Sequence, residues 1–582
     1  QYDAALKQYA TADGYASVPD TVLLPYGAKD AFYTLQLGLK LLNTIISTNK
    51  DRINEITQTH FGRPHYTWPY AHDLLCLWST MRCYPVLMEI MRNGLHLDID
   101  KFLRLCEFYE ATLQELLEAI RTEVNWPTFN PKSVAEVRAL LFGREFYKLK
   151  NKDLPHDVLS LNLTPVFPTN STFKEWSELD ELERKAAQPS TSAEVLDILY
   201  TRYKEDERAR KVIKLLMDYR TIDHVINNSA YGPMRDASGQ YVKREGVYVF
   251  EQGYGSYLDY DGRVRSFFKP LNKTGRWASS PNLMNLPKEA EGRYKQILGD
   301  KYFCSLRNVF TVAQSGWVFL ECDIKAAEMY VMAALSQDTE LLNDLKKSEL
   351  PPDHPEYRDI HSYNAVVAFQ LDCPPTKDGL KAIGKVGLRQ AAKRIIYGAA
   401  YGQTVEALFT MLSAEDSSLA LEEVQRVREA IFGRYHRLGA WLGRAAHLGK
   451  KGLTVINPFG RKRRFVSGSH NRSEITSYLA SQFAREAKNF PIQSAVADLM
   501  NESLGWIYDH RNECQTPFRI VNFVHDSILI EVPEDNVEEL KQFLMRCFRE
   551  NCIPIRDIQD GELLQSEPLY LSLDFSVSKE WQ

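Results

Sequence analysis

The chain lacks the features that mark disulfide-rich, zinc-binding or membrane-spanning proteins. Its 582 residues include nine cysteines, an odd number, and no two of them form a Cys-x-x-Cys pair. A disulfide framework or a zinc site is therefore not expected, and a reducing compartment is indicated. No run of about 18 apolar residues occurs, and nothing after Gln1 reads as a signal peptide, so we expect no membrane association.

The composition is that of a folded protein with several domains. Hydrophobic residues make up 44% of the chain and charged residues 25%. The net charge of −5 does not indicate a nucleic-acid binder, but the charge is unevenly placed. Residues 443–472 contain eight Lys or Arg residues and no Asp or Glu, including Lys462 and Arg463. Such a patch can bind phosphates while the rest of the surface repels them, although a solvated loop has a similar composition.

Four side chains at a spacing of four residues dominate residues 379–402. Arg389, Lys393, Tyr397 and Tyr401 would lie along one face of a helix, over about 18 Å. Cations suit phosphate oxygens and flat rings suit a base or sugar, so this face could hold a nucleoside triphosphate. The alternative is an ordinary amphipathic helix with long cations at its surface and two core tyrosines.

Two aspartates follow apolar segments that predict buried strands. Asp323 ends the strand 317–323, and Asp526 lies at the turn of a hairpin predicted for 519–532. Two acids brought together from distant sequence would form a site for two hard cations, a known arrangement for chemistry at phosphorus. Two unrelated turn aspartates are the alternative.

The remaining pattern predicts a mixture of long helices and short strands. Short strands rich in Tyr, Val and Phe begin after residue 241, and residues 147–185 read as a loop-rich insertion. Helices are expected at 20–45, 74–125, 193–228, 325–345, 359–371, 379–402, 420–450 and 473–510.

With these motifs in order, the chain resembles the family A DNA polymerases. Asp323 with Glu328 resembles the family's first palm motif, and His525-Asp526 its last one. The other segments that carry the resemblance are Met88-Glu89 with Asn93-Gly94, Phe129–Ser133, Ser190–Ser192, Thr274–Arg276 with Ser279–Leu283, Arg389–Gly402, and Arg485–Gln493.

The resemblance implies an α+β right hand, with an antiparallel palm sheet and helical fingers and thumb. We expect an exonuclease remnant and connection at 1–75, a thumb at 76–244, the palm at 245–340 and 473–582, and the fingers at 341–472. The activity implied is DNA-directed DNA polymerisation, a nucleotidyl transfer that extends a primer with dNTPs and releases pyrophosphate.

The resemblance also implies roles for individual residues. Asp323, Asp526 and the backbone carbonyl of Ile324 would hold two Mg²⁺ ions, for which Mn²⁺ could substitute. Glu328 would exclude ribonucleotides. The dNTP would be bound by His361, Arg389, Lys393 and Tyr397. The primer and template side would comprise Arg276, Tyr401, Arg485, Asn489, Gln493 and His525, with Lys462 and Arg463 of the basic patch.

The chain departs from the family pattern at several positions. Ala326 stands where the family has a Gln that contacts the triphosphate, and Lys325 or a backbone group is left to compensate. Ser527 replaces a third carboxylate, and Glu531 lies at an odd offset that points it away. Tyr397 stands where many members have Phe, which predicts efficient use of dideoxynucleotides.

The first residues resemble the end of a proofreading domain. Tyr26 and Asp30 match the last motif of the family's 3′–5′ exonuclease, whose earlier metal ligands are missing. We therefore expect a fragment of a longer enzyme that does not proofread.

Two other functions remain as alternatives. A single-subunit RNA polymerase shares the palm and the His-Asp-Ser motif, whereas Glu328 favours DNA synthesis. A template-binding protein with an inactive palm is the second.

The expected partners are primer–template DNA, dNTPs and a processivity or replisome factor. We expect a monomer in a bacterial or phage-host cytoplasm, with an organelle as the alternative.

Overall fold

The computed structural model describes most of the chain after residue 71. No helix in that part is both long and apolar enough to cross a membrane. The described residues are 28, 32–40, 72–146, 159–168, 173–174, 188–244, 246–269, 272–286, 293–302, 304–413, 420–459, 461–465, 475–550 and 571–582. Tyr26, Asp30 and most of the 147–185 insertion lie outside them, so the expectations for these residues stay untested.

A four-stranded antiparallel sheet forms the centre of the molecule, in the order β12-β13-β9-β14. The predicted strand at 317–323 and the predicted hairpin at 519–532 are confirmed, whereas β14 was not predicted. The strands are β9 (Trp317–Ile324), β12 (Arg519–Val524), β13 (Ser527–Pro533) and β14 (Leu573–Ser578). The C-terminal strand β14 pairs with β9, although about 250 residues separate them in the sequence.

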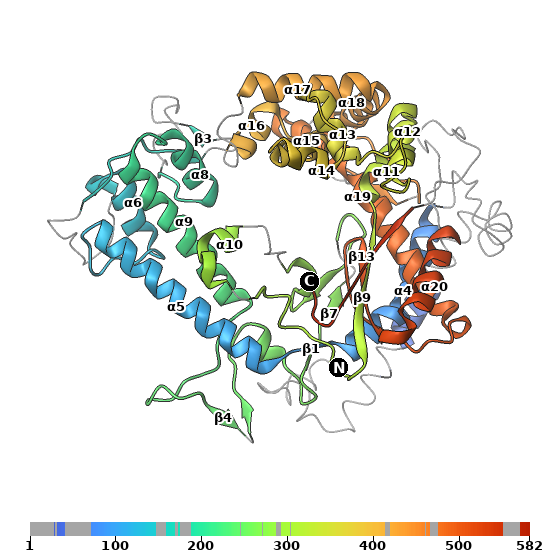
Figure 1. Cartoon of the computed structure of the whole chain (residues 1–582), viewed down its shortest axis with the longest axis horizontal. Coiled ribbons are helices and arrows are strands. Elements are labelled where there is room, and N and C mark those ends of the chain that lie inside the picture. The colour runs from blue at the N-terminus through green and yellow to red at the C-terminus, as the bar shows by residue number, and fades with distance from the viewer. Residues whose placement is uncertain are drawn as a thin grey trace.

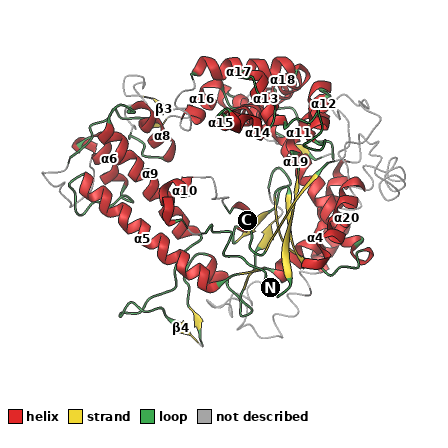
Figure 2. Ribbon diagram, in the orientation of Figure 1, coloured by secondary structure: helices red, strands yellow, loops and turns green. Residues whose placement is uncertain are grey.

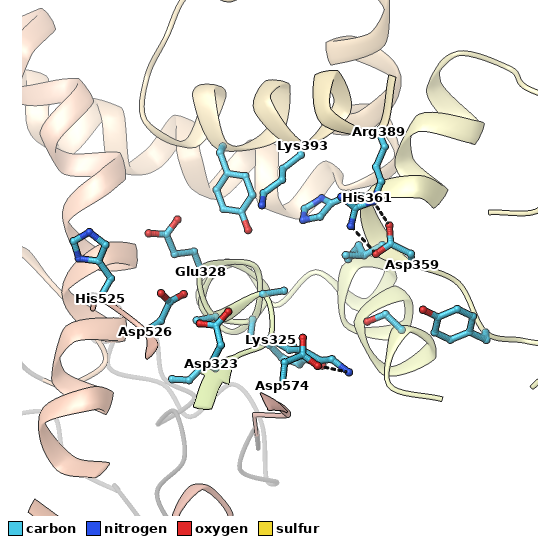
Figure 3. Close-up of a pocket in the computed structure, with 18 of the residues that line it drawn as sticks. Asp323, Lys325, Glu328, Asp359, His361, Arg389, Lys393, His525, Asp526 and Asp574 are labelled. Atoms are coloured by element: carbon cyan, nitrogen blue, oxygen red, sulfur yellow. Dashed lines mark hydrogen bonds and ion pairs between the residues drawn. The ribbon is translucent and has the colours of Figure 1, made fainter. Parts of the chain in front are cut away.

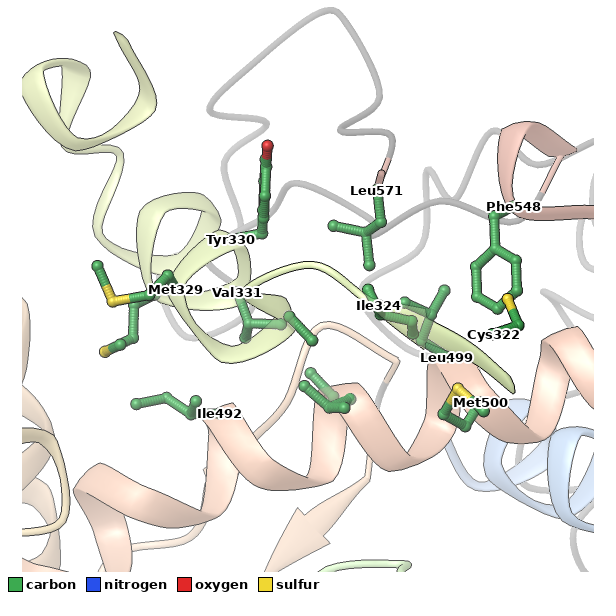
Figure 4. Close-up of a cluster of buried hydrophobic side chains, with 14 of the residues drawn as sticks. Cys322, Ile324, Met329, Tyr330, Val331, Ile492, Leu499, Met500, Phe548 and Leu571 are labelled. Atoms are coloured by element: carbon green, nitrogen blue, oxygen red, sulfur yellow. The ribbon is translucent and has the colours of Figure 1, made fainter. Parts of the chain in front are cut away.

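Long helices cover one face of this sheet. They are α4 (His72–Asn93), α19 (Ser477–Asp509) and α20 (Val537–Glu550), while the shorter α11 (Ala327–Ser336) follows β9 and packs against α19. Figure 4 shows the buried side chains between α19 and β9, with Leu499 and Met500 near Ile324 and Cys322. Because both Cys322 and Ile324 are buried, the alternating Glu321 and Asp323 face the other way.

Two helical arms extend from the sheet (Figures 1 and 2). One arm has its own core, built around Trp126, Leu140 and Val212. It contains α5 (Ile99–Glu123), α6 (Val134–Phe142), α8 (Ala193–Arg202) and α9 (Glu207–Asn228), with α10 (Arg293–Leu298) beside it. The other contains α12 (Thr339–Ser348), α13 (Ile360–Ala368), α14 (Lys377–Ala382), α15 (Val386–Ala400), α16 (Val405–Ser413), α17 (Leu421–Arg434) and α18 (His436–Lys450).

Short antiparallel strand pairs lie outside the central sheet. They are β1 (Leu95–His96) with β6 (Arg263–Val264), β2 (Phe167–Pro168) with β3 (Phe173–Lys174), β4 (Lys243–Arg244) with β5 (Val247–Tyr248), β7 (Phe267–Lys269) with β8 (Ala278–Ser280), and β10 (Val455–Ile456) with β11 (Lys462–Arg463).

The predicted α+β class is confirmed, but several expected helices are divided. The 74–125 segment breaks at Gly94, which has a φ of +59°; a Cβ added there would lie only 2.8 Å from the Val264 carbonyl oxygen, so a side chain has no room. Asp98 then caps α5 by accepting a hydrogen bond from the Lys101 backbone N–H. The 325–345 segment divides in the same way, since Gln337 is left-handed and Asp338 caps α12.

Candidate active site

The end of the central sheet brings the two predicted aspartates together. Ser527, which follows Asp526, is the cross-strand partner of Asp323. The backbone N–H of Ile324 donates to the carbonyl of Asp526 at 3.0 Å, which ties the turn to the end of β9. The turn residue His525 has a φ of 59°, a conformation that non-glycine residues adopt rarely and at some energetic cost. The two strands thus hold both aspartates at one edge (Figure 3).

These aspartates belong to a pocket of about 580 Å³ that also reaches the face of α15. Figure 3 shows Asp323, Asp526 and Glu328 on one side, with Lys393, His361 and Arg389 across from them. Ten of the predicted site residues line it: Arg276, Asp323, Ile324, Glu328, His361, Arg389, Lys393, Tyr397, His525 and Asp526.

The helix α15 carries the two cations and the first of the two aromatic rings that the four-residue spacing predicted on one face. Arg389, Lys393 and Tyr397 lie within it, while Tyr401 is the residue at its C-terminal cap. The Lys393 ammonium lies 5.8 Å from the centre of the Tyr397 ring, and the Tyr397 and Tyr401 rings are 6.3 Å apart. The apolar side chains of Ala392, Ile395 and Ile396 are buried. Their burial anchors the helix in the core and leaves Arg389, Lys393 and Tyr397 facing the pocket.

Arg389 is held by Asp359, which sequence reasoning did not select. Its Nε and Nη2 donate to the two Asp359 carboxylate oxygens at 2.7 and 3.0 Å. Asp359 also caps α13 by accepting from the Ser362 N–H. Burial alone would raise the pKa of Asp359, but its bonds to Arg389 outweigh this effect and bring the pKa down to about 2.

His361 lies in the first turn of α13 and faces Tyr397, with 5.9 Å between the ring centres. Burial, with the nearby charge of Lys393, lowers the pKa of His361 to about 3. The imidazole is therefore neutral near pH 7. Its buried Nδ1 has no hydrogen-bond partner among the described residues, so a polar ligand would satisfy it.

Glu328 is fixed in place from two sides. Its carboxylate accepts a hydrogen bond from the Tyr401 hydroxyl and pairs with Arg276 at 3.1 Å. Burial, followed by the Glu328 charge, raises the pKa of Tyr401 and keeps its hydroxyl protonated as the donor. Burial also lowers the pKa of His525, and the charge of Arg276 adds to this effect.

Lys325 and Asp574 also line the pocket, and the sequence did not predict that Asp574 belongs to it. Asp574 of β14 is the direct cross-strand partner of Asp323, so both side chains share one face of the sheet. The carboxylate of Asp574 pairs with the Lys325 ammonium at 3.1 Å. An acid in the alternating segment 571–578 was the available signal, but its strand partner cannot be read from local sequence.

A carboxylate does lie beside Ser527, and it comes from β9. The Ser527 hydroxyl donates to Glu321 at 3.1 Å. Glu531, by contrast, is fully buried and pairs with Arg263 at 3.2 Å. The prediction that Glu531 cannot replace the missing acid is consistent with this placement.

Six other predicted residues within the described part of the chain lie outside the pocket lining: Tyr401 at the end of α15, Arg485, Asn489 and Gln493 on α19, and Lys462 and Arg463 in the basic patch. Arg485 lies against Gly402, where an added Cβ would be 2.7 Å from the Arg485 Cγ. Gln493 hydrogen-bonds to Tyr401, and the buried Asn489 Oδ1 has no partner among the described residues. Lys462 and Arg463 form β11, where Arg463 pairs with Glu486 at 2.6 Å, so part of the patch charge is neutralised internally.

The donor set at the sheet end fits magnesium. The described residues contain no cluster of three or more His, Cys, Asp or Glu side chains that could enclose a metal ion. Mg²⁺ commonly binds through one or two carboxylates and completes its shell with water and substrate phosphates. Asp323 and Asp526, open to a pocket lined with cations, provide such a partial shell.

A family model described as DNA polymerase family A matches residues 169–557, more than half of the chain. The chain belongs to DNA polymerase family A. Its relatives include DNA polymerase I of Caldicellulosiruptor bescii, 23% identical over 79% of this chain and 43% of that protein. The DNA polymerase of Escherichia phage T5 is 25% identical over 91% of this chain and 53% of that protein. The chain thus spans about half the length, or less, of these curated relatives.

The family A fold is also present in a solved structure. The POL domain of Pol1 from M. smegmatis, in complex with DNA primer-template and dNTP, superposes with a TM-score of 0.59 and 19% identity. The match covers 86% of this chain and 70% of that one. At this identity the likeness supports the right-hand polymerase fold, and the family model identifies the family.

Proposed function

We propose that this chain is a template-directed DNA polymerase that extends the 3′ end of a primer with dNTPs. One observation carries the proposal: a single pocket joins two aspartates at a sheet edge to the cations of α15 and to His361 of α13. A triphosphate on the cations would place its α-phosphorus near the aspartates. The primer 3′-hydroxyl would attack this α-phosphorus, and the bond to the β-phosphate would break to release pyrophosphate.

The metal requirement follows from the carboxylates. Divalent metal ions are general in family A, and we propose two Mg²⁺ ions held by Asp323, Asp526 and the Ile324 carbonyl, with Mn²⁺ as a substitute. When bound, they would activate the attacking oxygen and neutralise charge on the leaving phosphates. The protein's own part is to fix both carboxylates through the β9–β13 register and the Ile324–Asp526 hydrogen bond.

The cations and rings would bind and orient the nucleotide. Arg389 and Lys393 would neutralise the triphosphate, and the neutral His361 would donate one hydrogen bond to it. Tyr397 would stack under the sugar and base. Glu328, immobilised by Arg276 and Tyr401, would stand where a ribose 2′-hydroxyl must pass and so select deoxyribonucleotides.

The template and primer would lie beside α19 and the β7–β8 hairpin. Arg276 and Gln493 would contact minor-groove acceptors, which sit alike in all base pairs and report on pairing shape. Tyr401, Arg485, Asn489 and His525 would line the templating side, and Lys462 and Arg463 would meet phosphates. Residues 76–244 would then be the thumb, 245–340 and 473–582 the palm, and 341–472 the fingers.

The proposal extends to the oligomeric state, the partners and the absence of proofreading. The chain acts as a monomer in DNA replication or repair, with a processivity or replisome factor as a further partner. These 582 residues contain Asp30 without the other exonuclease ligands, so we expect no proofreading from this part of the sequence alone. A metal-dependent loss of 3′ nucleotides from a mismatched primer would contradict this last point.

Primer extension tests the proposal. A primed DNA template is incubated with Mg²⁺ and either dNTPs or rNTPs. We expect extension with dNTPs only. Extension with rNTPs would favour the RNA polymerase alternative, and no extension with either would favour a template-binding protein with an inactive palm.

A further inference from the structure

The cations that line the pocket are mostly engaged by the chain's own carboxylates. Lys393 lies over the Tyr397 ring, at 5.8 Å from its centre. Among the described residues, the other three are paired: Arg276 with Glu328 at 3.1 Å, Arg389 with Asp359 at 2.7 Å, and Lys325 with Asp574 at 3.1 Å. An anionic ligand that enters the pocket must therefore compete with an internal anion for three of these four cations.

The three ion pairs differ in how easily they exchange. The Arg389–Asp359 pair is bidentate, with 24% of each side chain exposed. The Arg276–Glu328 pair is similarly enclosed, at 21% and 15%. The Lys325 and Asp574 side chains are 42% and 60% exposed, and their contact is a single one. Exposed, monodentate pairs contribute little to stability, whereas partly buried bidentate pairs are costly to break. Lys325 is thus the paired cation that an incoming anion can recruit most readily.

The backbone places Lys325 on the wall of the pocket opposite α15. Its N–H donates to the Ser572 carbonyl at 2.9 Å, which ties it to the start of β14. Asp574 follows two residues later and is the cross-strand partner of Asp323 on the same face of the sheet. Figure 3 shows Lys325 and Asp574 together on the Asp323 side, with Lys393 opposite. A triphosphate between these walls would have cations on two sides.

We propose that Lys325 binds a terminal phosphate of the nucleotide and leaves Asp574 to do so. Asp574 is then a competing internal anion that holds the lysine at the pocket while no nucleotide is bound. The proposal rests on the proposed function, because it assumes that a nucleoside triphosphate occupies the pocket. It assigns a part in nucleotide binding to two residues from separate segments of the chain, joined by this ion pair.

The test is a double-mutant cycle in nucleotide affinity. The dissociation constant of a matched dNTP is measured for the protein bound to primer–template with a dideoxy-terminated primer, so that no catalysis is needed. Lys325→Met should weaken binding by about 5- to 10-fold, as expected for one charge-assisted contact. Asp574→Asn should strengthen binding by about 2- to 5-fold, since an exposed pair competes only weakly. In the Lys325→Met background, Asp574→Asn should change the logarithm of the dissociation constant by less than half as much as it does in the wild type.

A matched control lies near the end of the same strand. Lys579 pairs with Glu534 at 3.7 Å on the surface, outside the pocket lining. Lys579→Met removes a similar charge and should leave the affinity unchanged. Thermal unfolding of each variant verifies that the fold is retained.

Three outcomes would overturn the proposal. An unchanged affinity in Lys325→Met would mean that the lysine does not touch the nucleotide. Weaker binding in Asp574→Asn would mean that this carboxylate supports binding and does not compete. Equal effects of Lys579→Met and Lys325→Met would mean that only net charge matters. Failure here leaves the proposed function standing if the wild-type protein extends primers with dNTPs.

Discussion

Glu531 is a carboxylate near the site to which we assign a purely structural role, and that role can be tested sharply. It has no exposed surface, and its two oxygens accept from the Arg263 guanidinium at 3.2 and 3.3 Å. Arg519 lies 3.6 Å from the same carboxylate. Replacing Glu531 by Gln leaves the largely buried Arg263 charge uncompensated.

Removal of one partner from a buried ion pair typically costs about 3–5 kcal/mol of unfolding free energy. We therefore expect Glu531→Gln to lower the midpoint of thermal unfolding by at least about 5 °C. The Mg²⁺ concentration for half-maximal primer extension, measured below the new midpoint, should not change. The double variant Glu531→Leu, Arg263→Met removes both charges and should recover part of the lost stability.

Two results would contradict this role for Glu531. One is an unfolding midpoint that does not move in Glu531→Gln. The other is a raised Mg²⁺ requirement in the same variant, which would place Glu531 among the metal-binding groups.

Three further substitutions, at Glu328, Tyr397 and His361, test residues that line the pocket. Glu328→Ala should reduce the preference for dNTPs over rNTPs by about 100-fold in single-nucleotide incorporation, and an unchanged ratio would remove Glu328 from sugar selection. Tyr397→Phe should lower the incorporation of dideoxynucleotides relative to deoxynucleotides, and a constant ratio would contradict the role of its hydroxyl. His361 should add an acid-sensitive component to stability. With a folded pKa of about 3 and an unfolded value of about 6.5, the unfolded chain binds more protons between these values. Stability is therefore lost as the pH falls from about 6.5 towards 3, and His361→Gln should show a smaller drop in the unfolding midpoint between about pH 7.5 and pH 5. A drop equal to that of the wild type would contradict the depressed pKa.

Local sequence patterns predicted the parts of the site that depend on one element. The four-residue spacing from Arg389 to Tyr397 fixes a helix face wherever the helix packs. The apolar runs before Asp323 and Asp526 predicted two strand ends, and the register then joined them. Because these patterns are local, they can be recognised in the sequence without knowledge of the fold.

The missed residues depend on pairings between distant segments. Asp574 reaches the site only because β14 adds to the free edge of β9. Asp359 reaches Arg389 only because α13 packs beside α15, and the sequence around Asp359 does not specify this contact. The composition of the basic patch predicts phosphate binding or a solvated loop, yet Arg463 pairs with Glu486 and Arg461 with the buried Asp498, each at 2.6 Å. No local pattern specifies such partners.

The single-turnover rate of incorporation of one dNTP tests whether the two aspartates form the active site. Wild type, Asp323→Asn and Asp526→Asn are compared at saturating dNTP and Mg²⁺. The exposed Glu534→Gln serves as the control that also removes one negative charge. We expect each aspartate variant to lose at least about 1,000-fold in rate, with primer–template binding retained and the control unaffected. A rate in either aspartate variant within about tenfold of the wild type would contradict the assignment of this pocket as the polymerase active site.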